Sequence, residues 1–152
     1  MLKVREAKPE SILEFIGENF SAVIGIVSRL EGFTKGYLML MFNIEQAKKL
    51  LEVILSNNLN LPFDKVSKNF RLDLLREIGN IIAGNLTGEI GNIIKKRLSY
   101  TIPEVKPELL PALVDPICID LALKNSKLLF INSVLSSEAF QLQVGIVLLL
   151  TF

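Results

Sequence analysis

The sequence predicts an α+β fold, in which a pseudo-symmetric, mixed or antiparallel β-sheet carries two or three α-helices on one face. Three observations predict it. Apolar segments flank glycine-containing turns, as in β-hairpins; residues 70–98 show the periodicity of one long helix; and Glu6–Glu10 resembles Glu104–Glu108, an offset of 98 residues. With 152 residues, half of them apolar, the chain is expected to form one domain, residues 1–152, with many elements covered on both faces.

The first part of the chain contains a hairpin followed by a helix. Residues 11–16 fit either a strand or a helix by their period. Residues 20–27 and 37–42 are apolar segments on either side of a turn that contains two glycines, which predicts a β-hairpin. Residues 44–55 then show helical spacing. This helix is expected to end at the Asn57–Asn58 loop.

The second part of the chain begins with the long helix. We expect Ser67 or Asn69 to cap residues 70–98, with Asp73 in the first turn, where the helix dipole favours an anion. Residues 128–131 and 141–152 are expected to be strands. Four prolines between the long helix and these strands predict a segment broken into extended pieces: Pro103, Pro107, Pro111 and Pro116.

One stripe of the long helix is polar. At ~100° per residue, Glu77 and Asn80 lie within ~40° of Asp73, while the opposite side is apolar. Gly84 and Gly88 return to within ~60° of the same stripe, which allows a partner to approach the helix backbone. Glycines also suit helix-on-helix packing, but the three polar residues favour a docking face.

A second copy of part of this sequence follows. Glu-Ile-Gly-Asn-Ile-Ile occurs at residues 77–82 and again at 89–94. Twelve residues rotate a helix by ~120°, which is expected to place Glu89 and Asn92 on the apolar side. We therefore expect Asn85 and Asn92 to make a buried polar contact with a neighbouring element.

Four positions resemble the CheC/CheX/FliY family of chemotaxis response-regulator phosphatases. The family signature is Asp or Ser, three residues, Glu, two residues, Asn, twenty-two residues and Pro, and Asp73, Glu77, Asn80 and Pro103 match it. The resemblance favours a CheC-like fold with a strand at residues 11–16. It also implies a CheC-type chain without its first motif helix: a half-repeat 1–66 without that helix, and a half-repeat 67–152 with motif helix 70–98 and the single active site.

The resemblance implies a hydrolase that docks on phosphorylated CheY and hydrolyses its acyl phosphate. Glu77 and Asn80 are the expected catalytic residues: Asn80 orients the attacking water, and Glu77 anchors the regulator through its lysine. Asp73 and Gly84 are expected to support docking, and Pro103 to shape the adjoining loop. The chain is expected to bring no cofactor or metal of its own, because the bound regulator supplies Mg²⁺.

The same resemblance leaves a non-catalytic alternative. A chain of this kind also fits an interaction module that binds phosphorylated CheY or the receptor deamidase CheD, or a component like those of the flagellar switch. The slot left by an absent first helix predicts an apolar patch. Either a homodimer or another partner is expected on that side.

Composition excludes several other classes. A net charge of +1 and scattered lysines argue against nucleic-acid binding, and the absence of histidine excludes Cys/His dyads, Ser/His/Asp triads and His metal sites. The single cysteine, Cys118, is expected to be a core residue.

The longest charge-free run near an end, residues 139–152, is too short for a membrane span, and nothing resembles a signal peptide, so a cytoplasmic protein is expected.

Overall fold

The computed structural model describes residues 3–16, 22–124, 127–139 and 141–151. These residues form one seven-stranded sheet and four α-helices, which confirms the α+β class. The elements in chain order are β1 (Lys3–Ala7), α1 (Ile12–Ile16), β2 (Ala22–Gly32), β3 (Gly36–Asn43), α2 (Ile44–Ile54), α3 (Lys68–Ile94), β4 (Leu98–Tyr100), β5 (Glu104–Leu109), α4 (Leu110–Leu123), β6 (Leu128–Ser137) and β7 (Leu142–Thr151).

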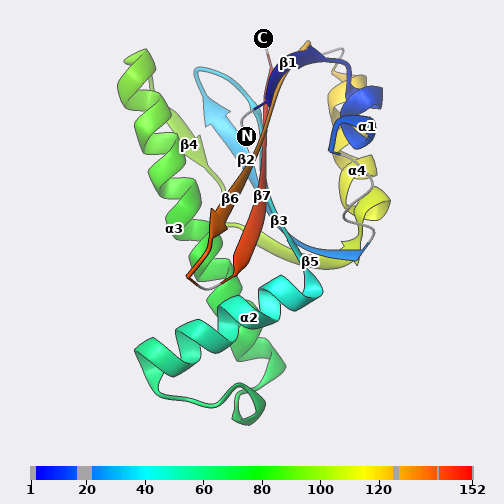
Figure 1. The fold of residues 1–152 in the computed structure, drawn as a ribbon. Coiled ribbons are helices and arrows are strands. Elements are labelled where there is room, and N and C mark those ends of the chain that lie inside the picture. Colours follow the sequence, from blue (N-terminus) through cyan, green and yellow to red (C-terminus); the bar gives the residue numbers. More distant parts are fainter. Residues whose placement is uncertain (1–2, 17–21, 125–126, 140, 152) are drawn as a thin grey trace.

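The strand order of the sheet is symmetric about its centre (Figure 1). The order is β1-β6-β7-β3-β2-β4, with β5 also paired to β2, and every described pair is antiparallel. Two hairpins, β2–β3 and β6–β7, meet through their second strands. An outer strand flanks each hairpin: β1 lies beside β6, and β5 lies beside β2.

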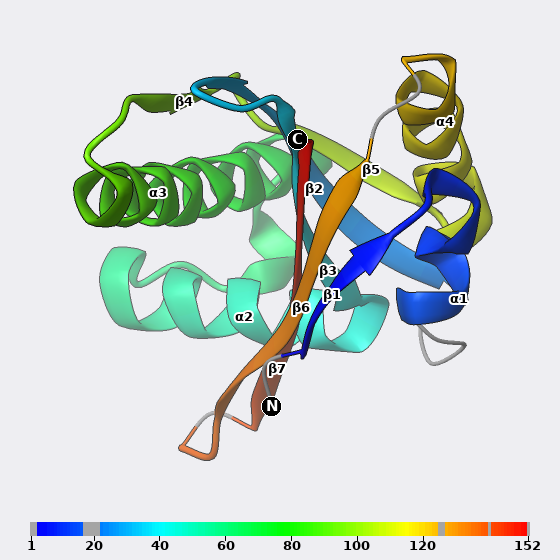
Figure 2. The same ribbon diagram turned by 90° about the horizontal axis from the view of Figure 1, so that it is seen from above.

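The helices cover both faces of the sheet, which corrects the expectation that they lie on one face. Helices α1 and α4 lie on one side, and α2 and α3 lie on the other (Figure 2). Strand β3 shows the reason, because each residue from Gly36 to Phe42 is buried. Tyr37, Met39 and Met41 face the α1 and α4 core, and the residues between them, such as Leu40, face the α2 and α3 core.

Several predicted elements are confirmed. The hairpin β2–β3 is present, although residues 20 and 21 lie outside the described residues. Helix α2 begins at Ile44 because Asn43 Oδ1 accepts a hydrogen bond from the backbone N–H of Gln46 (2.7 Å). It ends at Ile54 and continues as a π-helical turn, Leu55–Leu59, so the expected Asn57–Asn58 loop is helical instead. Strand β6 covers the first segment predicted as a strand, and β7 covers residues 142–151 of the second; Gln141 belongs to the turn before β7, and residue 152 lies outside the described residues.

The prediction of a strand at residues 11–16 is wrong. Ile12–Ile16 is the short helix α1, and the strand of this region is β1, which ends at Ala7. Ile12 and Ile16 are both buried, because side chains four residues apart lie on the same face of a helix. In a segment this short, that spacing also fits the alternation of a strand.

The prediction of extended pieces after Pro103 is only partly right. Strand β5 contains Pro107, but Pro111 and Pro116 belong to helix α4. Pro111 lies in the first turn, where a missing N–H is tolerated, whereas Pro116 removes one intrahelical hydrogen bond. Burial of five apolar side chains at helical spacing offsets that loss: Leu110, Leu113, Val114, Ile117 and Leu121.

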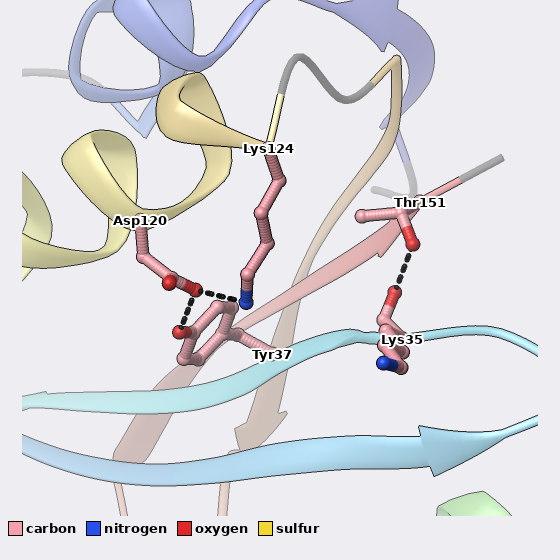
Figure 3. A network of polar contacts seen from close by, with 5 residues as sticks. All are labelled: Lys35, Tyr37, Asp120, Lys124 and Thr151. Atoms are coloured by element: carbon pink, nitrogen blue, oxygen red, sulfur yellow. Dashed lines mark hydrogen bonds and ion pairs between the residues drawn. The ribbon is translucent and has the colours of Figure 1, made fainter.

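A hydrogen bond between Tyr37 and Asp120 links α4 to the sheet (Figure 3). The hydroxyl of Tyr37, on β3, donates a hydrogen bond to Asp120 Oδ2 at 2.5 Å, and Lys124 Nζ lies 3.0 Å from the same oxygen. Burial, together with the Asp120 carboxylate, raises the pKa of Tyr37 to about 12. The hydrogen bonds from Tyr37 and Lys124 lower the pKa of Asp120.

None of the described helices combines the length and hydropathy that crossing a membrane requires.

Candidate functional site

Helix α3 carries the motif residues, and its ends differ from the expected ones. It begins at Lys68, because Ser67 Oγ accepts a hydrogen bond from the backbone N–H of Phe70 (3.1 Å). It ends at Ile94, where Lys95 has a left-handed backbone (φ 60°), rather than at residue 98. Leu98 is thereby free to start β4, the strand that pairs with β2 beside the helix.

Asp73 is the sixth residue of α3 and not part of its first turn, contrary to expectation. The helix dipole acts mainly on the first turn, so it does not explain an acid at this position. Asp73 Oδ1 instead accepts a hydrogen bond from Arg76 Nη1 at 2.6 Å, and both side chains are largely exposed. This pair is a surface ion pair that includes the first motif residue.

We call Asp73, Glu77 and Asn80 the motif face. Asp73 and Glu77 are exposed and Asn80 is half-buried. Four residues on the other side of the helix, at intervals of four, are buried against the sheet: Leu75, Gly79, Ala83 and Thr87. The sheet therefore determines which side of α3 is presented to solvent, and the three motif residues lie on that side.

Pro103 lies against the motif helix, although it is far from it in sequence. It is buried in the loop between β4 and β5, two strands that pair with successive parts of β2. A Cβ on Gly79 would lie 3.5 Å from Pro103 Cβ. The structure therefore brings the fourth signature position against the residue that precedes Asn80.

Tyr100, the last residue of β4, contacts Asn80 directly. Its hydroxyl lies 3.0 Å from Asn80 Oδ1 and 3.2 Å from the Asn80 backbone oxygen. It also lies over Gly84, where an added Cβ would be 3.1 Å from the hydroxyl. Gly84 thus makes room for Tyr100, while open space surrounds Gly88. The sequence did not predict Tyr100 as a site residue. The only sequence feature that pointed to it is a hydroxyl-bearing aromatic residue between the motif helix and Pro103.

The second copy of the motif sequence does not behave as expected. Glu89 and Asn92 are exposed rather than turned to the apolar side, and Asn85 is exposed too, so the expected buried polar contact is absent. The last turn of α3 is largely uncovered, since Ile93 is 77 % exposed. The two copies share a helix but differ in surroundings, because only the first lies beside Tyr100 and Pro103.

The motif face has one amide and two carboxylates, but no activated nucleophile. An amide side chain can bind and orient water, and it has no useful pKa for acid–base work. Cys118 lies on α4, and burial is the main cause that raises its pKa to about 11, so its thiol is unreactive near neutral pH. No group of three or more His, Cys, Asp or Glu side chains among the described residues is suited to hold a metal ion.

Comparison with known proteins identifies the fold. The sequence matches no protein-family model, and no curated protein resembles it significantly. A CheC-like chemotaxis protein of Shewanella oneidensis MR-1 superposes with a TM-score of 0.55 at 16 % identity, over 97 % of this chain and 82 % of that chain. FliY of Thermotoga maritima superposes with a TM-score of 0.59 at 12 % identity, over 98 % of this chain and 73 % of that chain.

A third similar structure is a complex. A chain of the CheX–CheY–BeF3–Mg²⁺ complex of Borrelia burgdorferi superposes with a TM-score of 0.55 at 17 % identity, over 93 % of this chain and 92 % of that chain. These identities are too low to transfer an activity, but the superpositions cover nearly the whole chain. The protein therefore has the fold of the CheC, CheX and FliY chemotaxis proteins.

Proposed function

We propose that this protein is a member of the CheC/CheX/FliY family that hydrolyses the aspartyl phosphate of a CheY-type response regulator. The observation that carries the proposal is the motif face itself. Asp73, Glu77 and Asn80 lie together on the exposed side of α3, and Pro103 packs against Gly79 of the same helix, the residue before Asn80. They do so in the fold of CheX, which forms a complex with CheY in Borrelia burgdorferi.

The chemistry available at this face suits a labile substrate. An acyl phosphate needs no protein nucleophile, and its hydrolysis requires mainly an in-line water and charge stabilisation. Tyr100 occupies the Oδ1 side of the Asn80 carboxamide. The Nδ2 donors are left to bind a water or a phosphoryl oxygen. Asn80 is therefore the proposed water-positioning residue, acting from the helix into the regulator's own site.

Glu77 is the proposed anchor. Its exposed carboxylate lies one turn before Asn80 on the same stripe, so it can pair with a lysine of the regulator while Asn80 enters the phosphorylated site. Asp73 extends the acidic edge of this surface by one more turn. Mg²⁺ held by the regulator would neutralise the phosphoryl oxygens, and the motif face would contribute orientation.

The proposal is tested by following phosphorylated CheY over time. CheY of the same organism is charged with acetyl phosphate, the phosphodonor is removed, and this protein is added at about a tenth of the CheY concentration. We expect faster decay with several turnovers per molecule. Unchanged decay with measurable complex formation would overturn catalysis in favour of the interaction module, and the absence of both would overturn the docking as well.

A further inference from the structure

The amide of Asn80 is held from a neighbouring strand and not only by its own helix. The Tyr100 hydroxyl lies 3.0 Å from Asn80 Oδ1 and 3.2 Å from the Asn80 backbone oxygen, so it contacts both the side chain and the backbone of Asn80. Both residues are half-buried. Among the hydrogen bonds of the described residues, the one from the Tyr100 hydroxyl to Oδ1 is the only one that involves the Asn80 carboxamide.

The backbone that carries Tyr100 is itself fixed. Strand β4 pairs with Leu30–Gly32 of β2, and Ser99 Oγ donates to the Glu31 backbone oxygen at 3.1 Å. The next residue, Thr101, is bonded twice to Arg29: its N–H donates to the Arg29 oxygen, and its Oγ1 accepts from the Arg29 N–H, both at 3.0 Å. These bonds on both sides give the tyrosine hydroxyl a rigid support.

Helix α3 leaves room for the tyrosine. A Cβ on Gly84, four residues after Asn80, would lie 3.1 Å from the Tyr100 hydroxyl, which is closer than most such contacts. Glycine inside a helix is unfavourable by ~1 kcal/mol relative to alanine. Close approach of the Tyr100 hydroxyl to the helix is a physical reason for glycine at this position. By contrast, a Cβ added at Gly88 would have no neighbour within 4 Å outside its own helix.

We propose that Tyr100 is a positioning residue for the reaction. It fixes the carboxamide of Asn80 in one rotamer, with Oδ1 turned to the hydroxyl and Nδ2 turned outward, before the regulator docks. This inference rests on the proposed function and adds a residue outside the four-position signature. Preorganisation of this kind raises the rate of the chemical step rather than the affinity, because the docking contacts are unchanged.

Tyr100→Phe is the test, because it keeps the ring and removes only the hydroxyl. We expect kcat for phosphorylated CheY to fall roughly tenfold with KM and binding unchanged. The matched control is Tyr37→Phe, which removes the hydroxyl of the chain's other tyrosine, on the opposite face of the sheet. This control is expected to leave kcat unchanged. Adding Tyr100→Phe to Asn80→Ala should have no further effect, since the group that it positions is gone.

A second readout does not depend on activity. The side-chain amide signals of Asn80 in the ¹H–¹⁵N spectrum of the free protein should shift in Tyr100→Phe and stay in place in Tyr37→Phe. An active parent whose kcat is unchanged by Tyr100→Phe would overturn the positioning role alone, as would unmoved Asn80 signals. An inactive parent would overturn the proposed function first, and the positioning role with it.

Discussion

The ring of Pro103 lies against Gly79, the residue before Asn80 in the motif helix, with 3.5 Å between Pro103 Cβ and the position that a Gly79 Cβ would take. The contact gives the long spacing of the signature a physical meaning. The chain leaves α3, forms β4 along the edge of β2, and returns to the helix at Pro103. The loop that ends at Pro103 therefore packs against the motif helix one residue before Asn80.

Gly79→Ala should destabilise the protein. Its Cβ would lie 2.4 Å from Ile26 Cγ2, so either the helix or β2 must move. Overpacking of this kind costs about 1–3 kcal/mol. Unfolding by urea should show a lower midpoint with the same slope. Gly88→Ala is the control, because nothing lies within 4 Å of its Cβ, and it should raise stability by up to about 1 kcal/mol. Equal effects of the two changes would contradict the packing.

The Tyr37–Asp120 hydrogen bond should make the free energy of unfolding depend on pH in alkaline solution. The pKa of Tyr37 is about 12 in the folded protein and about 10 when unfolded. Folding thus favours the protonated hydroxyl: its contribution to stability is complete below about pH 10 and is lost as the pH rises towards 12. The parent should lose stability in that range more steeply than Tyr37→Phe, as measured by urea unfolding at several pH values. Parallel curves would argue against the bond.

The Asp120 carboxylate should make the free energy of unfolding depend on pH in acid solution, with the opposite sign. The hydrogen bonds of Tyr37 and Lys124 lower the pKa of Asp120, so folding favours its carboxylate. That contribution is present above the unfolded value of about 3.9 and is lost as the pH falls through that value and below it. Asp120→Asn should therefore flatten the stability curve below about pH 4. A curve as steep as that of the parent would show that other carboxylates account for the acid loss.

Glu77→Gln should weaken docking as well as turnover. The variant keeps the shape of the side chain and removes the charge that pairs with the regulator's lysine in the proposed complex. Hydrogen bonds to charged groups are worth about 1.5–3 kcal/mol, so kcat/KM should fall at least tenfold. The control is Glu89→Gln, an exposed acid in the same local sequence. If both variants turn over like the parent, Glu77 is not the anchor.

The motif helix could be predicted because several local signals agree. Ser67 caps it, its apolar residues show helical spacing, and the acids and the amide lie on one stripe. Hairpin β2–β3 was predictable because two turn glycines separate its apolar segments, and α2 because residues 44–55 show helical spacing. These elements depend on interactions between residues close in sequence, which a pattern can show.

The errors come from interactions between distant parts of the chain. Pro116 argued against a helix, but burial of residues such as Leu113 and Ile117 against the sheet outweighs one lost hydrogen bond. Asn92 is exposed because the last turn of α3 is largely uncovered, and the helix period does not contain that information. Tyr100 was missed because its contact with Asn80 exists only once β4 pairs with β2.

The role of Asn80 can be separated from that of its local sequence by comparing two asparagines of α3. Asn80 and Asn92 occur in the same local sequence, yet only Asn80 accepts a hydrogen bond from Tyr100 and follows the residue on which Pro103 packs. The decay of phosphorylated CheY is followed with the parent, with Asn80→Ala and with Asn92→Ala. Asn80→Ala should abolish the acceleration while still binding the regulator, and Asn92→Ala should behave like the parent. Retained activity in Asn80→Ala would contradict the proposed role of Asn80.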